Sequence, residues 1–143
     1  MFLVKERIVI HCVFLAAFLM AMLLNGCATM SSYDAYIRNV GSEHIDHAGV
    51  IFGDHRIGGG VVAPGSHKRT GDIRHPIPEK ATVMWQDING KKYTTEVEVK
   101  KLLPPRKPEE TYEIFFDIYE DNTVAVKITS RRIPSYSRDY VTQ

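Results

Sequence analysis

The chain has little cysteine, and none in most of its length. Its two cysteines, Cys12 and Cys27, both precede residue 28. A disulfide within the remainder of the chain is therefore excluded. Any domain that folds there must be stabilised by strand pairing and by burial of apolar side chains, without a covalent cross-link.

The chain also lacks an excess of charge of one sign. It has 18 Lys and Arg against 17 Asp and Glu, and 16 of each remain after residue 26. No basic stripe follows one face of a helix or strand. This balance argues against a nucleic-acid partner, because such proteins carry concentrated positive charge.

A third absence is a helical pattern of apolar residues. No window of about eleven residues shows apolar side chains at helical spacing. Short strand-like runs separated by turns of Gly, Pro, Asn and Asp occur instead. The composition therefore favours an all-β domain.

One long apolar run is present, near the N-terminus. Residues 8–24 are apolar in the main, follow Lys5, Glu6 and Arg7, and end at Asn25-Gly26-Cys27. A charged start, an apolar centre and a small residue before the cleavage point make up an export signal. Residues 24–27 resemble a lipobox, in which the Cys27 thiol accepts diacylglycerol. The alternative is a plain transmembrane anchor, for which 17 residues is close to the minimum.

The lipobox predicts where the protein resides. Acyl chains on Cys27 would hold a small domain on a membrane, at about 0.8 kcal/mol per buried methylene. Ala28, and not Asp, follows the cysteine, which by resemblance to bacterial lipoproteins implies the outer membrane, facing the periplasm. No cofactor is expected beyond the covalent diacylglycerol and N-acyl group. We assign residues 1–26 to a signal peptide and residues 27–33 to a lipidated tether.

Alternation of side chains predicts strands in the rest of the chain. Residues 81–86 and 92–101 flank Asp87-Ile88-Asn89-Gly90, and Asn-Gly between two such runs predicts a hairpin. Further strands are predicted at 33–40, 48–52, 61–63, 112–118 and 124–128. Residues 66–79 and the proline-rich 104–108 are predicted loops. About seven short strands fit a single antiparallel β-sandwich over residues 34–130, with Trp85 in its core and a basic tail at 131–143.

The sequence contains no recognised pattern for a catalytic or metal-binding site. Five of the six histidines fall between residues 44 and 75, but none has a recognised metal-ligand spacing, so no metal is expected. The adjacent Ser66 and His67 do not form a nucleophile elbow. Asp117, Glu120 and Asp121 lack the calcium-loop pattern. The sequence therefore predicts a protein that is not an enzyme.

A partner-binding surface is the more favoured use of the loops. Residues 58–60 are three glycines, typical of a tight bend between strands. Charged residues gather on both sides of this bend, and arginine is enriched at interface hot spots. The predicted contact residues are Asp54, His55, Arg56, His67, Lys68 and Arg69. Arg56 and Arg69 rank highest, and the alternative is that these charges only solvate loops.

The chain resembles a family of small proteobacterial lipoproteins that carry a β-rich domain of unknown function. The resemblance rests on residues 45–52, on residues 58–60 with Ala63-Pro64-Gly65, on residues 77–80 followed by Val83 and Trp85, and on residues 97–100 and 121–124. A cysteine pair found in many relatives is missing, and His75-Pro76 occupies that neighbourhood.

Some lipoproteins of this kind are immunity proteins that neutralise type VI secretion phospholipase effectors. The resemblance therefore implies a periplasmic protein that binds a lipase effector. The alternative function is a structural accessory lipoprotein of a secretion or envelope complex.

Overall fold

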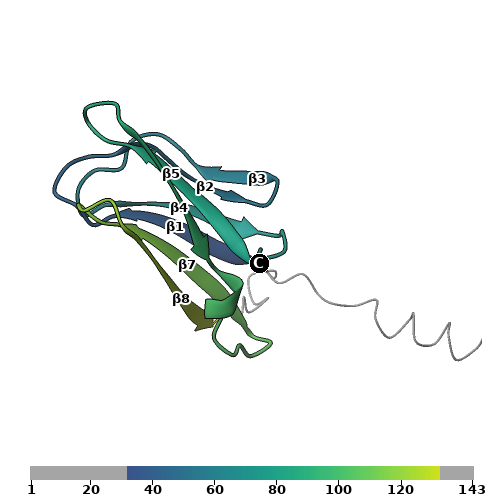
Figure 1. Ribbon diagram of the computed structural model, residues 1–143. Coiled ribbons are helices and arrows are strands. Elements are labelled where there is room, and N and C mark those ends of the chain that lie inside the picture. The colour runs from purple at the N-terminus through teal and green to yellow at the C-terminus, as the bar shows by residue number, and fades with distance from the viewer. Residues whose placement is uncertain (1–31, 133–143) are drawn as a thin grey trace, which may run out of the picture. The chain divides into compact units, whose positions relative to one another are not determined.

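A computed structural model describes residues 32–132 of the protein (Figure 1). The predicted signal peptide, Cys27 and most of the predicted basic tail lie outside the described residues. The elements are β1 (Tyr33–Asn39), β2 (Asp46–Phe52), β3 (His55–Gly58), β4 (His67–Ile73), β5 (Lys80–Gln86), β6 (Lys92–Glu98), the 3-10 turn η1 (Lys100–Leu102), β7 (Glu110–Ile118) and β8 (Val124–Arg132). No helix in residues 32–132 is long and apolar enough to cross a membrane.

The eight strands form two four-stranded sheets packed face to face, which confirms the predicted all-β sandwich. Sheet I has the strand order β4-β1-β7-β8, and sheet II has the order β3-β2-β5-β6. Figure 1 shows the two layers, with β2, β3 and β5 above β1, β7 and β8. Strand β8 continues through Arg132, two residues beyond the predicted end of the domain.

The predicted hairpin is present, and β7 and β8, at two further predicted strands, form a second one. Strands β5 and β6 pair from Lys80↔Glu98 to Gln86↔Lys92. In their turn the Asp87 carboxylate accepts hydrogen bonds from the Asn89 and Lys91 amides, and Gly90 has a φ of +81°. These interactions lower the pKa of Asp87, chiefly through the Lys91 amide. The Asn-Gly pattern thus identified the turn through local chemistry alone.

One strand pair contradicts the prediction of a purely antiparallel sandwich. Strands β1 and β7 are parallel, with Tyr33 opposite Tyr112 and Asn39 opposite Ile118. All the other pairs are antiparallel. A parallel pair needs a long crossover, and here the chain between β1 and β7 builds the whole of sheet II. Local alternation carries no information about such a distant partner.

The predicted loops in the first half of the chain are partly wrong. Residues 67–73 form β4 along the edge of sheet I, and His55 begins the four-residue β3. Within β4, Ile73 alone is buried, since the other side chains of this edge strand face solvent or lie at the sandwich margin. A polar edge strand lacks the apolar alternation by which a strand is recognised in a sequence.

The core lies between the sheets. Trp85 is 3% exposed, as predicted, and the predicted neighbours Val83 and Phe116 are fully buried, while Val97 and Val126 are partly buried against the core. The Trp85 ring stacks on Tyr93 of the next strand, with ring centroids 5.3 Å apart. Because one set of alternate residues fills this core, the other set is left to form the two outer faces.

Candidate functional site

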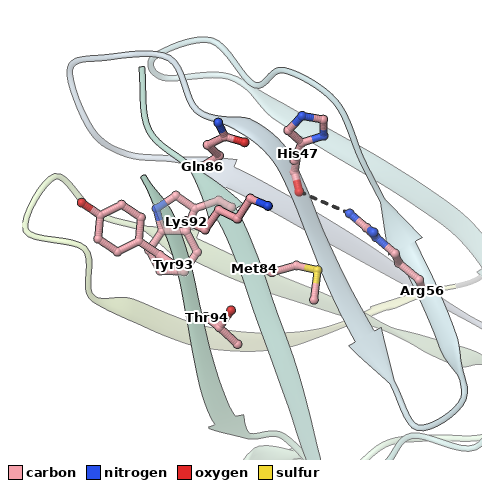
Figure 2. Close-up of a pocket in the computed structure, with 8 residues that line it drawn as sticks. His47, Arg56, Met84, Gln86, Lys92, Tyr93 and Thr94 are labelled. Carbon is pink, nitrogen blue, oxygen red and sulfur yellow. Dashed lines mark hydrogen bonds between the residues drawn. The ribbon is translucent and has the colours of Figure 1, made fainter. Parts of the chain in front are cut away.

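The outer face of sheet II carries a groove of about 400 Å³ (Figure 2). Residues from all four strands of the sheet line it: His47, Arg56, Met84, Trp85, Gln86, Lys92, Tyr93 and Thr94. We call this feature the outer groove. Its volume falls within the range of natural binding sites.

The alternation of side chains along β5 determines which residues form the floor of the outer groove. Val83 and Trp85 point into the core, so Met84 between them points outward, opposite Thr94 of β6. On its other side Met84 lies opposite Gly49 of β2. Gly49 has no side chain, and a Cβ at this position would lie 3.1 Å from Nε of Arg56. Because Gly49 has no side chain, the outer surface of the sheet is recessed at this point.

A β-bulge shapes one wall of the outer groove. The pairing of β2 with β5 shifts register between Asp46 and Gly49, and His47 within the bulge has a φ of +51°. Positive φ is uncommon for a residue with a side chain, and bulges re-aim side chains. The Arg56 guanidinium donates a long hydrogen bond of 3.5 Å to the His47 carbonyl, which Figure 2 shows as a dashed line.

Basic groups dominate the outer groove. Arg56 stands on the β3 side and Lys92 on the β6 side, and Figure 2 shows the Lys92 side chain extending toward His47. No carboxylate is among the lining residues. Within the described part of the chain, neither Arg56 nor Lys92 forms an ion pair.

Two acidic residues near the outer groove already have partners. Asp46 accepts a hydrogen bond from the His47 amide, and its carboxylate lies 3.7 Å from Nε2 of the same histidine. Glu96, further along β6, is bound by Lys80 at 2.6 Å. The residues that line the groove thus include two cations and no carboxylate, on a chain whose overall charge is close to zero.

The outer face of sheet I is different, because its charges are paired with each other. The Asp117 carboxylate, 6% exposed, accepts two hydrogen bonds from Arg38. The Asp34 carboxylate, 5% exposed, accepts hydrogen bonds from Arg69 at 2.7 Å and from Arg131 at 3.1 Å. The bond to Asp117 raises the pKa of Arg38 above its usual range.

Aromatic rings complete this face. Tyr36 stacks on Phe115 with centroids 4.6 Å apart, and Cζ of Arg38 lies over the Phe115 ring, 4.7 Å from its centroid. The Tyr36 hydroxyl donates a hydrogen bond to Glu113, and burial followed by this bond raises the pKa of Tyr36. On the outer face of sheet I, the two nearly buried carboxylates and the Tyr36 hydroxyl therefore already have partners.

The six predicted contact residues are divided between the two sheets. Asp54 alone lies in a turn, since His55 and Arg56 belong to β3 and the other three begin β4. Arg56 lines the outer groove. His55 stacks on His75 with ring centroids 3.5 Å apart.

The β4 residues have partners inside the domain. Lys68 donates a hydrogen bond to the Gly59 carbonyl, and Arg69 binds Asp34. The His67 ring packs against Tyr36 at 5.7 Å. Arg69, ranked beside Arg56 from the sequence, is thus engaged in stabilising sheet I.

Of the residues that line the outer groove, the sequence identified only Arg56 as a contact residue, and those it missed include His47, Met84 and Lys92. The alternation of β5 and β6 placed Met84 and Lys92 on the outward face. Nothing in the sequence, however, fixed which strand lies beside which, so their convergence with Arg56 could not be found. The bulge that aims His47 also has no local sequence pattern.

The histidines are dispersed over the domain. His47 lies in the outer groove, His55 and His75 stack on each other, and His67 packs on sheet I. Across residues 32–132, no group of three or more His, Cys, Asp or Glu side chains is arranged to hold a metal ion.

Comparisons with known proteins give little further guidance. No protein-family model matches the chain, and no curated protein matches it. An NMR structure of a protein from Eubacterium rectale is similar to 72% of this chain and to 93% of its own, at 13% identity and a TM-score of 0.46. A likeness at this level identifies neither a family nor an activity.

Proposed function

We propose that this protein is a lipid-anchored binding protein of the bacterial envelope that captures a protein partner through the outer groove. The observation that carries the proposal is a groove bordered by two basic side chains, Arg56 and Lys92, that form no ion pair among residues 32–132. Arginine and methionine are enriched in protein interfaces. Arg56 and Met84 both project from a paired sheet, which limits the conformational entropy lost on binding.

The anchor follows from the lipobox at residues 24–27. Cys27 lies six residues before Tyr33, where β1 begins. An extended tether of that length reaches about 20 Å. Lipid on Cys27 would thus hold the sandwich close to the bilayer while leaving it free to reorient, which suits capture of a partner arriving at the membrane.

The partner we propose is a phospholipase effector delivered by type VI secretion, which makes the protein an immunity protein. The support for this finer statement is the resemblance to proteobacterial lipoproteins described above. A lipase must reach the membrane to act, and a lipid-anchored inhibitor meets it there.

The anchor is tested by Cys27→Ser, because a hydroxyl does not form the thioether. We expect the variant to lose labelling by a fatty-acid analogue and to leave the membrane fraction, whereas Cys12→Ser keeps both properties. A Cys27→Ser protein that still carries label would overturn the lipoprotein assignment.

The immunity function is tested in competition. Deleting the gene should sensitise cells to neighbours that deliver the effector, and a plasmid copy should restore protection. The purified chain should inhibit the lipase at one-to-one stoichiometry. If the deletion has no competition defect and the protein copurifies with an envelope complex, the accessory function replaces immunity.

A further inference from the structure

We infer that the outer groove binds an extended acidic segment of the partner protein, with carboxylates meeting Arg56 and Lys92 and an apolar side chain resting on Met84. This inference deepens the proposed function and rests on it for the partner's being a protein. It names the chemistry by which the groove recognises that partner.

The first argument is charge. The outer groove is lined by two cations and a histidine without a carboxylate, and its two cations have no ion pair in the described part of the chain. Other arginines of the sandwich are held by carboxylates, as Arg38 is by Asp117 and Arg69 by Asp34. Free cations in a groove attract an anionic ligand and speed its approach.

The second argument is spacing. Arg56 is on β3 and Lys92 on β6, and β2 and β5 lie between them. Three strand spacings of about 4.8 Å separate these strands by roughly 14 Å, and the register places Lys92 four residues further along the sheet than Arg56. Their backbones are therefore more than about 14 Å apart on a diagonal, but both side chains lean inward toward His47, which brings the charged ends closer together. An extended segment advances about 3.3 Å per residue, so carboxylates four residues apart are about 13 Å apart and project from the same side. A segment crossing the strands therefore presents one carboxylate to each cation.

The third argument is the floor. Met84 lies midway between the cations, on β5, with Thr94 beside it and Gly49 on its other side. An extended segment places the residue between its two carboxylates on the same face, above Met84. The flexible thioether side chain of methionine adapts to different apolar partners. The motif that fits is thus Glu-x-apolar-x-Glu.

The experiment uses the full-length lipidated protein in detergent micelles and a fluorescent peptide containing Glu-Ser-Leu-Ser-Glu. We expect saturable binding by anisotropy that weakens as salt increases. The peptide with Gln in place of both Glu should bind about tenfold more weakly or worse. The Arg56→Gln, Lys92→Gln double variant should show a similar loss for the acidic peptide.

Lys127→Gln is the matched control, because Lys127 is exposed on the outer face of sheet I, opposite Phe115. It removes one positive charge outside the groove, against two in the double variant, and should leave binding unchanged. Equal affinity for the Glu and Gln peptides, or an unchanged double variant, overturns the inference. Binding of phosphatidylglycerol vesicles that depends on Arg56 and Lys92, in place of peptide binding, also overturns it and makes the groove a lipid-headgroup site.

Failure of the inference is distinguishable from failure of the proposed function. If the double variant still inhibits the effector and protects cells, the partner binds elsewhere. In that case the groove inference is wrong and the proposed function stands. If Cys27 carries no lipid while the peptide binds as expected, the anchored function falls and the groove chemistry remains.

Discussion

On the outer face of sheet I, Asp34 and Asp117 are nearly buried, and each carboxylate holds an arginine. On the outer face of sheet II, Arg56 and Lys92 border a groove and have no ion pair among residues 32–132. The two faces belong to the same sandwich and cover the same core. They differ in whether the charged side chains already have partners.

This difference separates stability from recognition. A buried carboxylate that loses its arginine is left desolvated and unpaired, so the sheet I network makes the fold sensitive to substitution. An exposed cation without a partner contributes little to folding, since water solvates it in both states. We therefore expect substitutions on sheet I to change the free energy of unfolding, and those on sheet II to change binding.

The largest expected effect tests the core beneath both faces. Trp85→Ala should lower the free energy of unfolding by about 3–5 kcal/mol, because it leaves a large cavity and removes the stacking on Tyr93. Urea unfolding measures this, and Thr94→Ala, at an exposed position on β6, is the control. A native fluorescence spectrum typical of water-exposed tryptophan would contradict the buried position.

A matched arginine pair tests the comparison directly. Arg38→Ala should lower the free energy of unfolding by about 2–3 kcal/mol, because it leaves the Asp117 carboxylate without its partner and removes a cation from the Phe115 ring. Arg56→Ala should stay within about 0.5 kcal/mol of the unsubstituted protein. Equal losses at the two positions, measured by urea unfolding, would show that Arg56 is structural and would erase the distinction between the faces.

The junction between the sheets gives an intermediate effect. Gly58 ends β3 with a φ of +76°, and a Cβ there would approach Cδ1 of Ile37 on sheet I to 2.4 Å. Gly58→Ala should therefore cost about 2 kcal/mol from backbone strain and overpacking. Gly53→Ala is the control, because Gly53 has a φ of +55° but no atom near a Cβ. Thermal unfolding of the two variants separates the clash from the strain.

The sequence predicted those parts of the fold that depend on neighbouring residues. Alternation along β5 to β8 and the Asn89-Gly90 turn gave the second half of the sandwich, since each hairpin is specified within about twenty residues. The parallel pairing of β1 with β7 was not predicted, because it depends on a contact between segments about 79 residues apart. The edge strands β3 and β4 were missed because most of their side chains are exposed.

The candidate site was predicted only in part, for the same reason. Arg56 was identified from its charge and its position beside the glycines. Lys92 lies 36 residues later, and three strand pairings in sheet II bring it to the same face. Arg69 shows the opposite error. Its sequence environment matches that of Arg56, but pairing of β4 with β1 places it against Asp34.

The smallest effect at neutral pH concerns Tyr33, on the inner side of β1. Its hydroxyl is buried and has no hydrogen-bond partner among the described residues, and burial raises its pKa to about 12. Removing an unpaired buried hydroxyl is neutral or favourable, so Tyr33→Phe should change the free energy of unfolding at pH 7 by about 0–1 kcal/mol, toward greater stability.

The variant should behave differently in alkali. In the unfolded chain Tyr33 ionises near pH 10, whereas in the fold it keeps its proton to about pH 12. The unfolded state therefore binds fewer protons across that range, so the stability that Tyr33 contributes is complete below pH 10 and is lost as the pH rises toward 12. Tyr33→Phe removes this loss, which amounts to roughly 2.7 kcal/mol at its limit. Urea unfolding of both proteins at pH 7 and pH 11 measures it, and parallel pH dependences would show that the Tyr33 hydroxyl reaches water.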